Sequence, residues 1–243
     1  MRRILRNNEK KCRYSGQNYP LRVFMGMLVF FLLMLVNCFE FFCGAEEKNK
    51  EMIIVIDAGH GGNDPGKVSA DGITEKDINL EIALKLKEEF ENRGVKVILT
   101  RDCDKCLADP GATNKKKSDM IKRMEIVNDS GAALLISIHQ NSYKDSKVRG
   151  AQTFYYGSSN ESKKYAENIQ HMLKKEADNE NNRLAKAENN YYILRKSACP
   201  AVIIECGFLS NPDETRKLTD EKYQQKLARA IADAVIGNID KKR

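Results

Sequence analysis

Two of the chain's three histidines stand at comparable places, each shortly after an apolar run. His60 follows the run at residues 52–57, and His139 follows the run at 133–138. Runs of this kind predict buried β-strands. Catalytic zinc sites often hold the ion with two His and one Glu, which leaves a fourth position for water. Glu75, at the start of a predicted helix, completes such a set, so the three residues predict a zinc site that promotes hydrolysis.

A fourth residue suits the proton transfer that such a hydrolysis requires. Glu205 ends a third apolar run, at residues 201–205. Loss of hydration beside that run should raise the pKa of its carboxyl group. The attacking water must lose a proton and the departing amine must gain one, which is the work of a general acid–base residue. We therefore predict that Glu205 is the catalytic base and does not hold the metal.

Each of these residues also has a purely structural interpretation. A single histidine after a strand is usually a loop or core residue. Glu75 is compatible with a first-turn residue that the helix dipole favours, and Glu205 with a structural carboxylate. The third histidine, His171, lies in a charged helical stretch, and we predict that it is on the surface.

The elements that must position these residues alternate along the chain from residue 51 onward. We expect strands at 52–57, 95–99, 133–138, 148–156 and 201–205, and helices at 120–128, 163–175 and 222–239, besides one that Thr74 caps and Gly94 ends. Unbroken apolar strands separated by helices predict a single α/β domain, with a mostly parallel central sheet and helices on both faces. Such sheets bind ligands at the carboxyl ends of their strands, which would bring His60, His139 and Glu205 together.

The first 45 residues have the form of an export signal. A basic stretch precedes an apolar run at 23–36, and the small residues at 43–45 suit a signal peptidase. We expect residues 1–45 to be a signal peptide or membrane anchor, and residues 46–243 to be the catalytic domain outside the cytoplasmic membrane. If the leader is not cleaved, residues 21–43 would attach the protein to the membrane.

Charge and cysteine content narrow the function further. The net charge is +7, but residues 1–45 hold seven basic and two acidic side chains, which leaves 34 basic and 32 acidic residues, or +2, in the rest. A nucleic-acid partner is therefore not expected. Cys103 and Cys106 form a lone C-x-x-C, for which a local disulfide, a redox pair and two ordinary thiols all remain open.

Five motifs, in order, resemble the zinc-dependent N-acetylmuramoyl-L-alanine amidases of the third amidase family. They are IVIDAGHGGNDPG at 54–66, TEKDINL at 74–80, LTRDCD at 99–104, LLISIHQNS at 134–142 and VIIECGFLSNPDE at 202–214. The resemblance implies that His60, Glu75 and His139 bind zinc and that Glu205 is catalytic. It also matches Asn141 to a family residue near the second histidine. Gln140 departs from the family pattern, which has a small or aliphatic residue there, and the segment around Cys103 and Cys106 is also unusual.

The implied substrate is peptidoglycan, cut between the lactyl group of muramic acid and the L-alanine of the stem peptide. A leader followed by a catalytic domain alone is similar to the germination-specific amidases, which implies a role in the spore cortex. The alternatives are a vegetative cell-separation amidase, a zinc peptidase that cuts within the stem peptide, and an inactive wall-binding protein. Relatives often depend on an activator protein, so we also expect that a partner is possible.

Overall fold

The computed structural model describes residues 25–34 and 51–240, which form two separate units. Residues 25–34 are helical. Within the described ranges, no helix combines the length and the apolar character that crossing a membrane requires. The rest of the predicted leader, including its expected cleavage site at 43–45, lies outside the described residues.

One sheet organises residues 51–240. Its strands are β1 (Ile53–Ala58), β2 (Lys96–Leu99), β3 (Leu134–Asn141), β4 (Gln152–Tyr155), β5 (Lys186–Ala187) and β6 (Ala201–Phe208). Their order across the sheet is β2-β1-β3-β6-β4-β5. The strands β2, β1, β3 and β6 run parallel, whereas β4 runs antiparallel to β6 and pairs in parallel with β5. The predicted α/β fold with a mostly parallel sheet is therefore confirmed.

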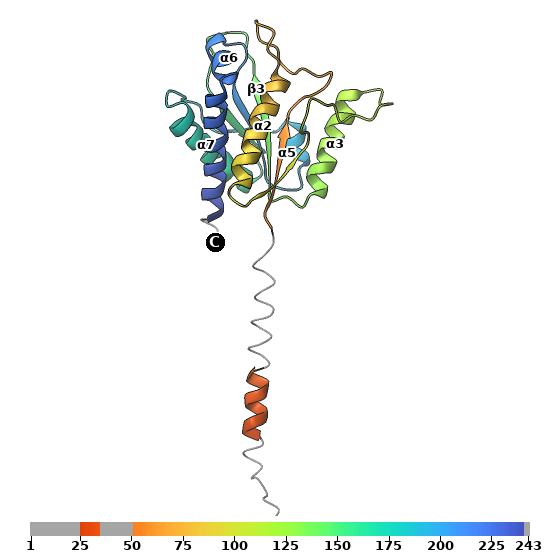
Figure 1. Ribbon diagram of the computed structural model, residues 1–243, viewed down its shortest axis with the longest axis vertical. Helices are drawn as coiled ribbons and strands as arrows, with labels where there is room; N and C mark the ends of the chain where they lie inside the picture. The colour runs from red at the N-terminus through yellow and green to blue at the C-terminus, as the bar shows by residue number, and fades with distance from the viewer. Residues whose placement is uncertain (1–24, 35–50, 241–243) are drawn as a thin grey trace, which may run out of the picture. The chain divides into compact units, whose positions relative to one another are not determined.

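Helices cover both faces of this sheet (Figure 1). They are α2 (Glu75–Glu91), α3 (Lys115–Asp129), α4 (Asn160–Met172), α5 (Tyr192–Lys196), α6 (Pro212–Leu218) and α7 (Glu221–Asp240), with a π-helical turn, Leu173–Ala177, after α4. Side chains of α2, α4 and α7 share one hydrophobic cluster with the sheet, and side chains of α3 and α5 share another. Neighbouring strand residues point to opposite faces, so Ile54 and Ile56 belong to the first cluster and Val55 to the second.

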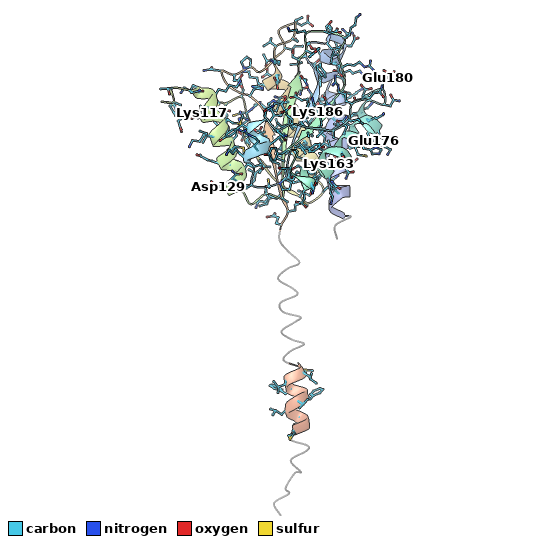
Figure 2. The ribbon with its side chains drawn as sticks, turned by 180° about the vertical axis from the view of Figure 1, so that it is seen from behind. Lys117, Asp129, Lys163, Glu176, Glu180 and Lys186 are labelled. Atoms are coloured by element: carbon cyan, nitrogen blue, oxygen red, sulfur yellow. The ribbon has the colours of Figure 1, made fainter. Side chains whose placement is uncertain are left out.

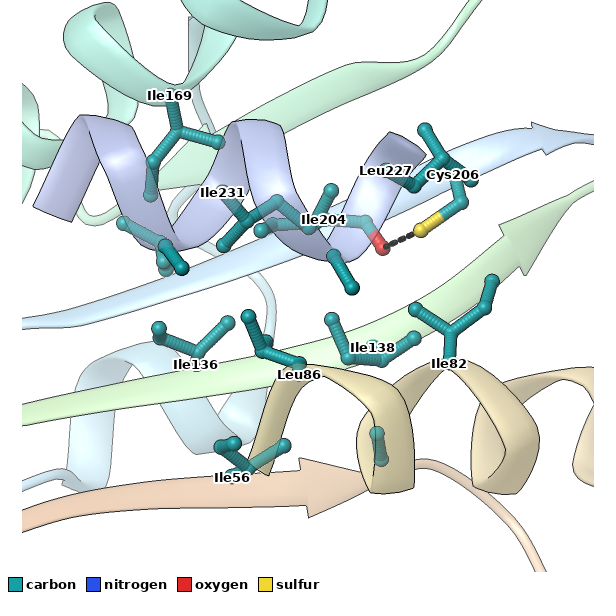
Figure 3. Packing of buried hydrophobic residues seen from close by; sticks show 14 of the residues in the cluster. Ile56, Ile82, Leu86, Ile136, Ile138, Ile169, Ile204, Cys206, Leu227 and Ile231 are labelled. Carbon is teal, nitrogen blue, oxygen red and sulfur yellow. Dashed lines mark hydrogen bonds between the residues drawn. The ribbon is translucent and has the colours of Figure 1, made fainter. Parts of the chain in front are cut away.

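The larger cluster fixes the middle of the sheet against its helices. Figure 3 shows Ile136 and Ile138 of β3 beside Leu86 of α2, and Ile204 of β6 beside Ile231 of α7. Each of these five side chains is fully buried. Close packing on this face holds the strands in one register, so the residues at their carboxyl ends have fixed positions.

Many charged residues lie on the outside of this unit. Figure 2 labels Lys117 and Asp129 on α3, Lys163 on α4, Glu176 in the π-helical turn, Glu180 in the following loop and Lys186 on β5, all of them exposed. Acidic and basic side chains are interspersed among these labelled positions.

Several boundaries differ from the sequence-based predictions. The helix expected at 120–128 begins earlier, at Lys115, because Asn114 caps it by accepting a hydrogen bond from the Lys117 backbone. The strands expected to end at 138 and 205 continue for three more residues, to Asn141 and Phe208. Thr74 does precede α2, but its side chain makes no capping hydrogen bond to the backbone. Its hydroxyl donates to Asp77 instead.

Candidate metal centre

His60 lies on the loop that follows β1. Its backbone conformation is one that residues other than glycine rarely adopt. Its φ is 62°, in the left-handed region. Such conformations cost energy and persist where the surroundings enforce them, often at functional sites. Here the carbonyl of His60 accepts a hydrogen bond of 2.6 Å from the Arg123 guanidinium, which helps to hold the loop.

His139 and Glu205 lie directly opposite each other on neighbouring strands. They are register partners in the parallel pairing of β3 and β6. Both stand inside their strands, three or fewer residues from the ends at Asn141 and Phe208, so the prediction that His139 follows its strand was wrong by this margin. The prediction that strand order brings His139 and Glu205 to one rim holds, since β3 lies between β1 and β6.

Glu75 is the first residue of α2, and both histidines converge on one of its oxygens. Its Oε1 lies 3.2 Å from His60 Nε2 and 2.9 Å from His139 Nδ1. Ligand atoms from the three residues all lie within 4.8 Å of one another. Two nitrogens and a carboxylate oxygen at this separation can bind one metal ion. Two His and one Glu are also the ligand types found in catalytic zinc sites.

The backbone around the cluster leaves no room for additional side chains. A Cβ atom on Gly59 would lie 2.2 Å from Cε1 of His139, and one on Gly66 would lie 2.5 Å from Oε2 of Glu75. Gly66 also has a φ of 69°, which disfavours other residues. These two glycines are therefore part of how the sequence builds the cluster.

Further groups orient the side chains of His60 and Glu75. Asp64 Oδ2 lies 2.9 Å from His60 Nδ1, which leaves His60 Nε2 facing Glu75. The backbone N–H of Lys67 donates to Glu75 Oε2 at 2.8 Å. A carboxylate behind a ligand histidine is the usual arrangement in metal sites, because it fixes the ring and its tautomer.

The surroundings of Glu75 and Glu205 shift the pKa values of the two carboxyl groups in opposite directions. Burial alone would raise the pKa of Glu75, but hydrogen bonds from His139 and His60 hold that pKa well below its usual range. Glu75 is therefore an anion at neutral pH. Burial raises the pKa of Glu205 to about 7. Its side chain is only 8% exposed, and its Oε2 has no hydrogen-bond partner among the described residues. A carboxylate in this state readily exchanges protons near neutral pH.

Two buried arginines support the His60 loop, and sequence reasoning did not identify this function. Arg123 of α3 donates to Asp57 Oδ1 at 2.7 Å and to the Ala58 carbonyl at 2.8 Å. Arg101, which follows β2, donates to the Ala58 carbonyl at 2.8 Å and the Gly59 carbonyl at 3.0 Å. Arg101 belongs to the motif LTRDCD at 99–104, but the motif does not indicate what its side chain contacts. Arg123 is marked in the sequence only as a basic residue within the helix predicted at 120–128.

The remaining candidates lie outside the cluster. His171 is exposed, as predicted. Asn141 is half-buried, and its side-chain oxygen accepts from the Ser142 backbone at 2.8 Å. Cys103 and Cys106 are free, exposed thiols, so the structure shows no disulfide between them. Between them, Asp104 accepts a 2.7 Å hydrogen bond from the Gly62 backbone, which places this segment against the His60 loop.

Comparison with known proteins shows which family the chain resembles. A model of the N-acetylmuramoyl-L-alanine amidase family (Amidase_3) matches residues 54–237. The germination-specific N-acetylmuramoyl-L-alanine amidase of Bacillus subtilis is 39% identical over 187 residues, which cover 76% of this chain and 78% of that protein. LytC, another N-acetylmuramoyl-L-alanine amidase of Bacillus subtilis, is 31% identical over 75% of this chain and 34% of its own length.

Solved structures show the same relationship. The CwlD amidase from Clostridioides difficile, solved in complex with the GerS lipoprotein, is 43% identical and superposes with a TM-score of 0.76 over 78% of this chain and 98% of that one. An N-acetylmuramoyl-L-alanine amidase from Clostridium difficile 630 is 33% identical, with a TM-score of 0.72 over 80% of this chain and 100% of that one. Since the family model covers most of the chain, this protein belongs to the N-acetylmuramoyl-L-alanine amidase family Amidase_3.

Proposed function

We propose that this amidase uses zinc to hydrolyse the amide bond between the muramic acid lactyl group and L-alanine in peptidoglycan, and that it acts in spore cortex maturation. The family supports the amidase activity. The cortex role is supported by the germination-specific relative of Bacillus subtilis and by the similarity to CwlD, which match nearly the whole catalytic unit. A vegetative cell-separation amidase is the alternative role for the same chemistry.

The observation that carries the proposal is the convergence of His60, Glu75 and His139, whose ligand atoms lie within 4.8 Å of one another. These three residues would hold the ion, with His60 presenting Nε2 and His139 presenting Nδ1 toward Glu75. When bound, zinc supplies a Lewis acid that polarises a carbonyl group and makes water more acidic. The anionic state of Glu75 suits this role, since a ligand must be deprotonated to bind a metal.

Glu205 transfers the protons of the reaction, as a general base and then as a general acid. From its position opposite His139 on the neighbouring strand, its carboxylate takes a proton from the attacking water. It then gives that proton to the departing nitrogen of L-alanine, which leaves as a neutral amine. A carboxyl group that titrates near neutral pH can accept and donate in turn, and burial gives Glu205 this property by raising its pKa to about 7.

The substrate and the leader support an extracellular location. Peptidoglycan lies outside the cytoplasmic membrane, and residues 1–45 have the pattern of an export signal or anchor that precedes a catalytic domain at 46–243. Residues 21–43 would attach the protein to the membrane if the leader is retained. The complex of CwlD with a lipoprotein supports an activator partner for this chain as well.

The third histidine provides a matched control for the metal assignment. We expect the exported protein to bind about one zinc ion per chain. His60→Ala and His139→Ala should each lose both zinc and activity, whereas His171→Ala, at an exposed position, should keep both. Zinc content is measured by atomic absorption after dialysis against metal-free buffer. Full occupancy in both His60→Ala and His139→Ala would overturn the ligand assignment.

A further inference from the structure

The carboxylate of Glu75 is held by neutral donors as well as by the histidines. The Gln140 backbone N–H donates to Glu75 Oε1 at 3.1 Å, and the Asn79 side-chain amide approaches the same oxygen at 3.4 Å. Asn79 lies one helical turn after Glu75 on α2 and has no exposed surface. Its amide therefore reaches the ligand from inside the protein, where water cannot replace it.

The orientation of the Asn79 amide follows from its neighbours. Its Nδ2 donates to the Gly59 carbonyl at 3.0 Å and faces Glu75 Oε1, and both of these groups are acceptors. Turning the amide over would place its oxygen against these two acceptors, and the resulting repulsion would push the Glu75 carboxylate away from its position. The carbonyl Oδ1 of Asn79 must therefore point away from the metal cluster, toward a donor.

Gln140 is that donor. Its side-chain Nε2 donates to Asn79 Oδ1 at 3.1 Å, and its side chain is 2% exposed. The opposite end of the Gln140 amide, Oε1, has no hydrogen-bond partner among the described residues. Burying an unpaired oxygen costs stability, and the hydrogen bond from Nε2 to the fully buried Asn79 offsets part of that cost. The contribution of Gln140 is thus the direction it imposes on Asn79.

We propose that Asn79 and Gln140 are positioning residues that tighten zinc binding, with Gln140 acting through Asn79 to orient the Glu75 carboxylate. This inference rests on the proposed zinc site and extends it to two residues that do not touch the ion. Gln140 immediately follows the ligand His139 and donates through its backbone to the ligand Glu75, while its side chain donates to Asn79. Substitution of groups that orient metal ligands typically weakens metal binding by about 10- to 100-fold.

The test measures zinc affinity of the full chain by competition with a fluorescent zinc chelator, starting from metal-free protein. Gln140→Met has a similar length but cannot donate to Asn79, and we expect its zinc dissociation constant to rise by about 10- to 100-fold. Asn79→Ala should weaken binding at least as much. In the double variant the effect of Gln140→Met should vanish, because the Asn79 amide through which the Gln140 side chain acts has been removed. Circular dichroism establishes that each variant is folded, and Gln140→Leu replaces Gln140→Met if the latter does not fold.

The matched control is Gln170→Met. Gln170 is also a buried glutamine, and its side chain accepts from Thr153 N–H at 2.8 Å and donates to the Ala151 carbonyl at 3.1 Å. Its loss should lower stability and leave zinc affinity unchanged. Wild-type zinc affinity in folded Gln140→Met, or equal effects of that change with and without Asn79, would overturn the inference. Failure of the wild-type chain to bind zinc would instead overturn the proposed metal centre.

Discussion

Replacing Glu205 by Gln should slow the reaction and, at neutral pH and above, stabilise the metal-free protein. Gln has nearly the shape of Glu but neither accepts a proton at neutral pH nor carries a charge. The side chain is 8% exposed and its Oε2 lacks a hydrogen-bond partner among the described residues, so the native protein bears the cost of a buried, poorly solvated anion. The same burial that makes Glu205 a suitable base should therefore lower stability.

The size of the stability effect follows from the pKa. Burial raises the pKa of Glu205 from 4.5 to about 7. The folded protein then binds this proton more tightly than the unfolded chain, so the contribution is fully present below pH 4.5 and is lost as pH rises through 7. The shift corresponds to about 3 kcal/mol at most. The free energy of unfolding of Glu205→Gln minus that of wild type should grow by up to this amount between pH 4.5 and pH 8.

Urea denaturation of both metal-free proteins at several pH values measures this difference. Zinc content and kcat of the loaded proteins are measured beside it, and kcat should fall by about 10²- to 10⁴-fold in Glu205→Gln while zinc content stays near wild type. Parallel stability curves across this pH range would refute the buried-anion argument. A nearly normal kcat, or a loss of zinc that added metal reverses, would show that Glu205 is not the base and that it and Glu75 exchange roles.

Two further predictions concern the loop that carries His60 and the location of the protein. Arg123→Met should lower the free energy of unfolding by about 3–5 kcal/mol, because it leaves the buried Asp57 carboxylate without its cation. Urea denaturation measures this loss. A loss below about 1 kcal/mol would contradict the role given to Arg123. Protease added to intact protoplasts should digest the catalytic unit, since the leader precedes it; complete protection, with active protein in the cytosol, would contradict export.

The sequence was most informative where one physical pattern dominates. Unbroken apolar runs predicted the central strands, and the rule that ligands bind at their carboxyl ends predicted that His60, His139 and Glu205 approach one another. Glu75 could be placed because a helix begins after Thr74, on the same side of the sheet. The three predicted ligands do form one cluster in the structure.

The missed features depend on contacts between distant segments. The short strand β5 and the short helices α5 and α6 contain too few residues for a periodic pattern. The hydrogen bonds of Arg123 to the β1 loop and of Gln140 to Asn79 join residues more than 60 positions apart. Neither pairing leaves a local signal, because Arg123 lies in an ordinary helix and Gln140 in an apolar strand. The direct contact of two histidines with one Glu75 oxygen likewise required the folded chain.

The proposed reaction is the zinc-dependent cleavage of the bond between muramic acid and L-alanine. Digestion of purified peptidoglycan by the metal-free protein, with and without added zinc, tests it most directly when the products are identified by mass spectrometry. We expect free stem peptides that begin with L-alanine, and intact glycan strands, only when zinc is present. Peptides shortened within the stem would favour a peptidase and new reducing ends a glycosidase; either result would contradict this assignment.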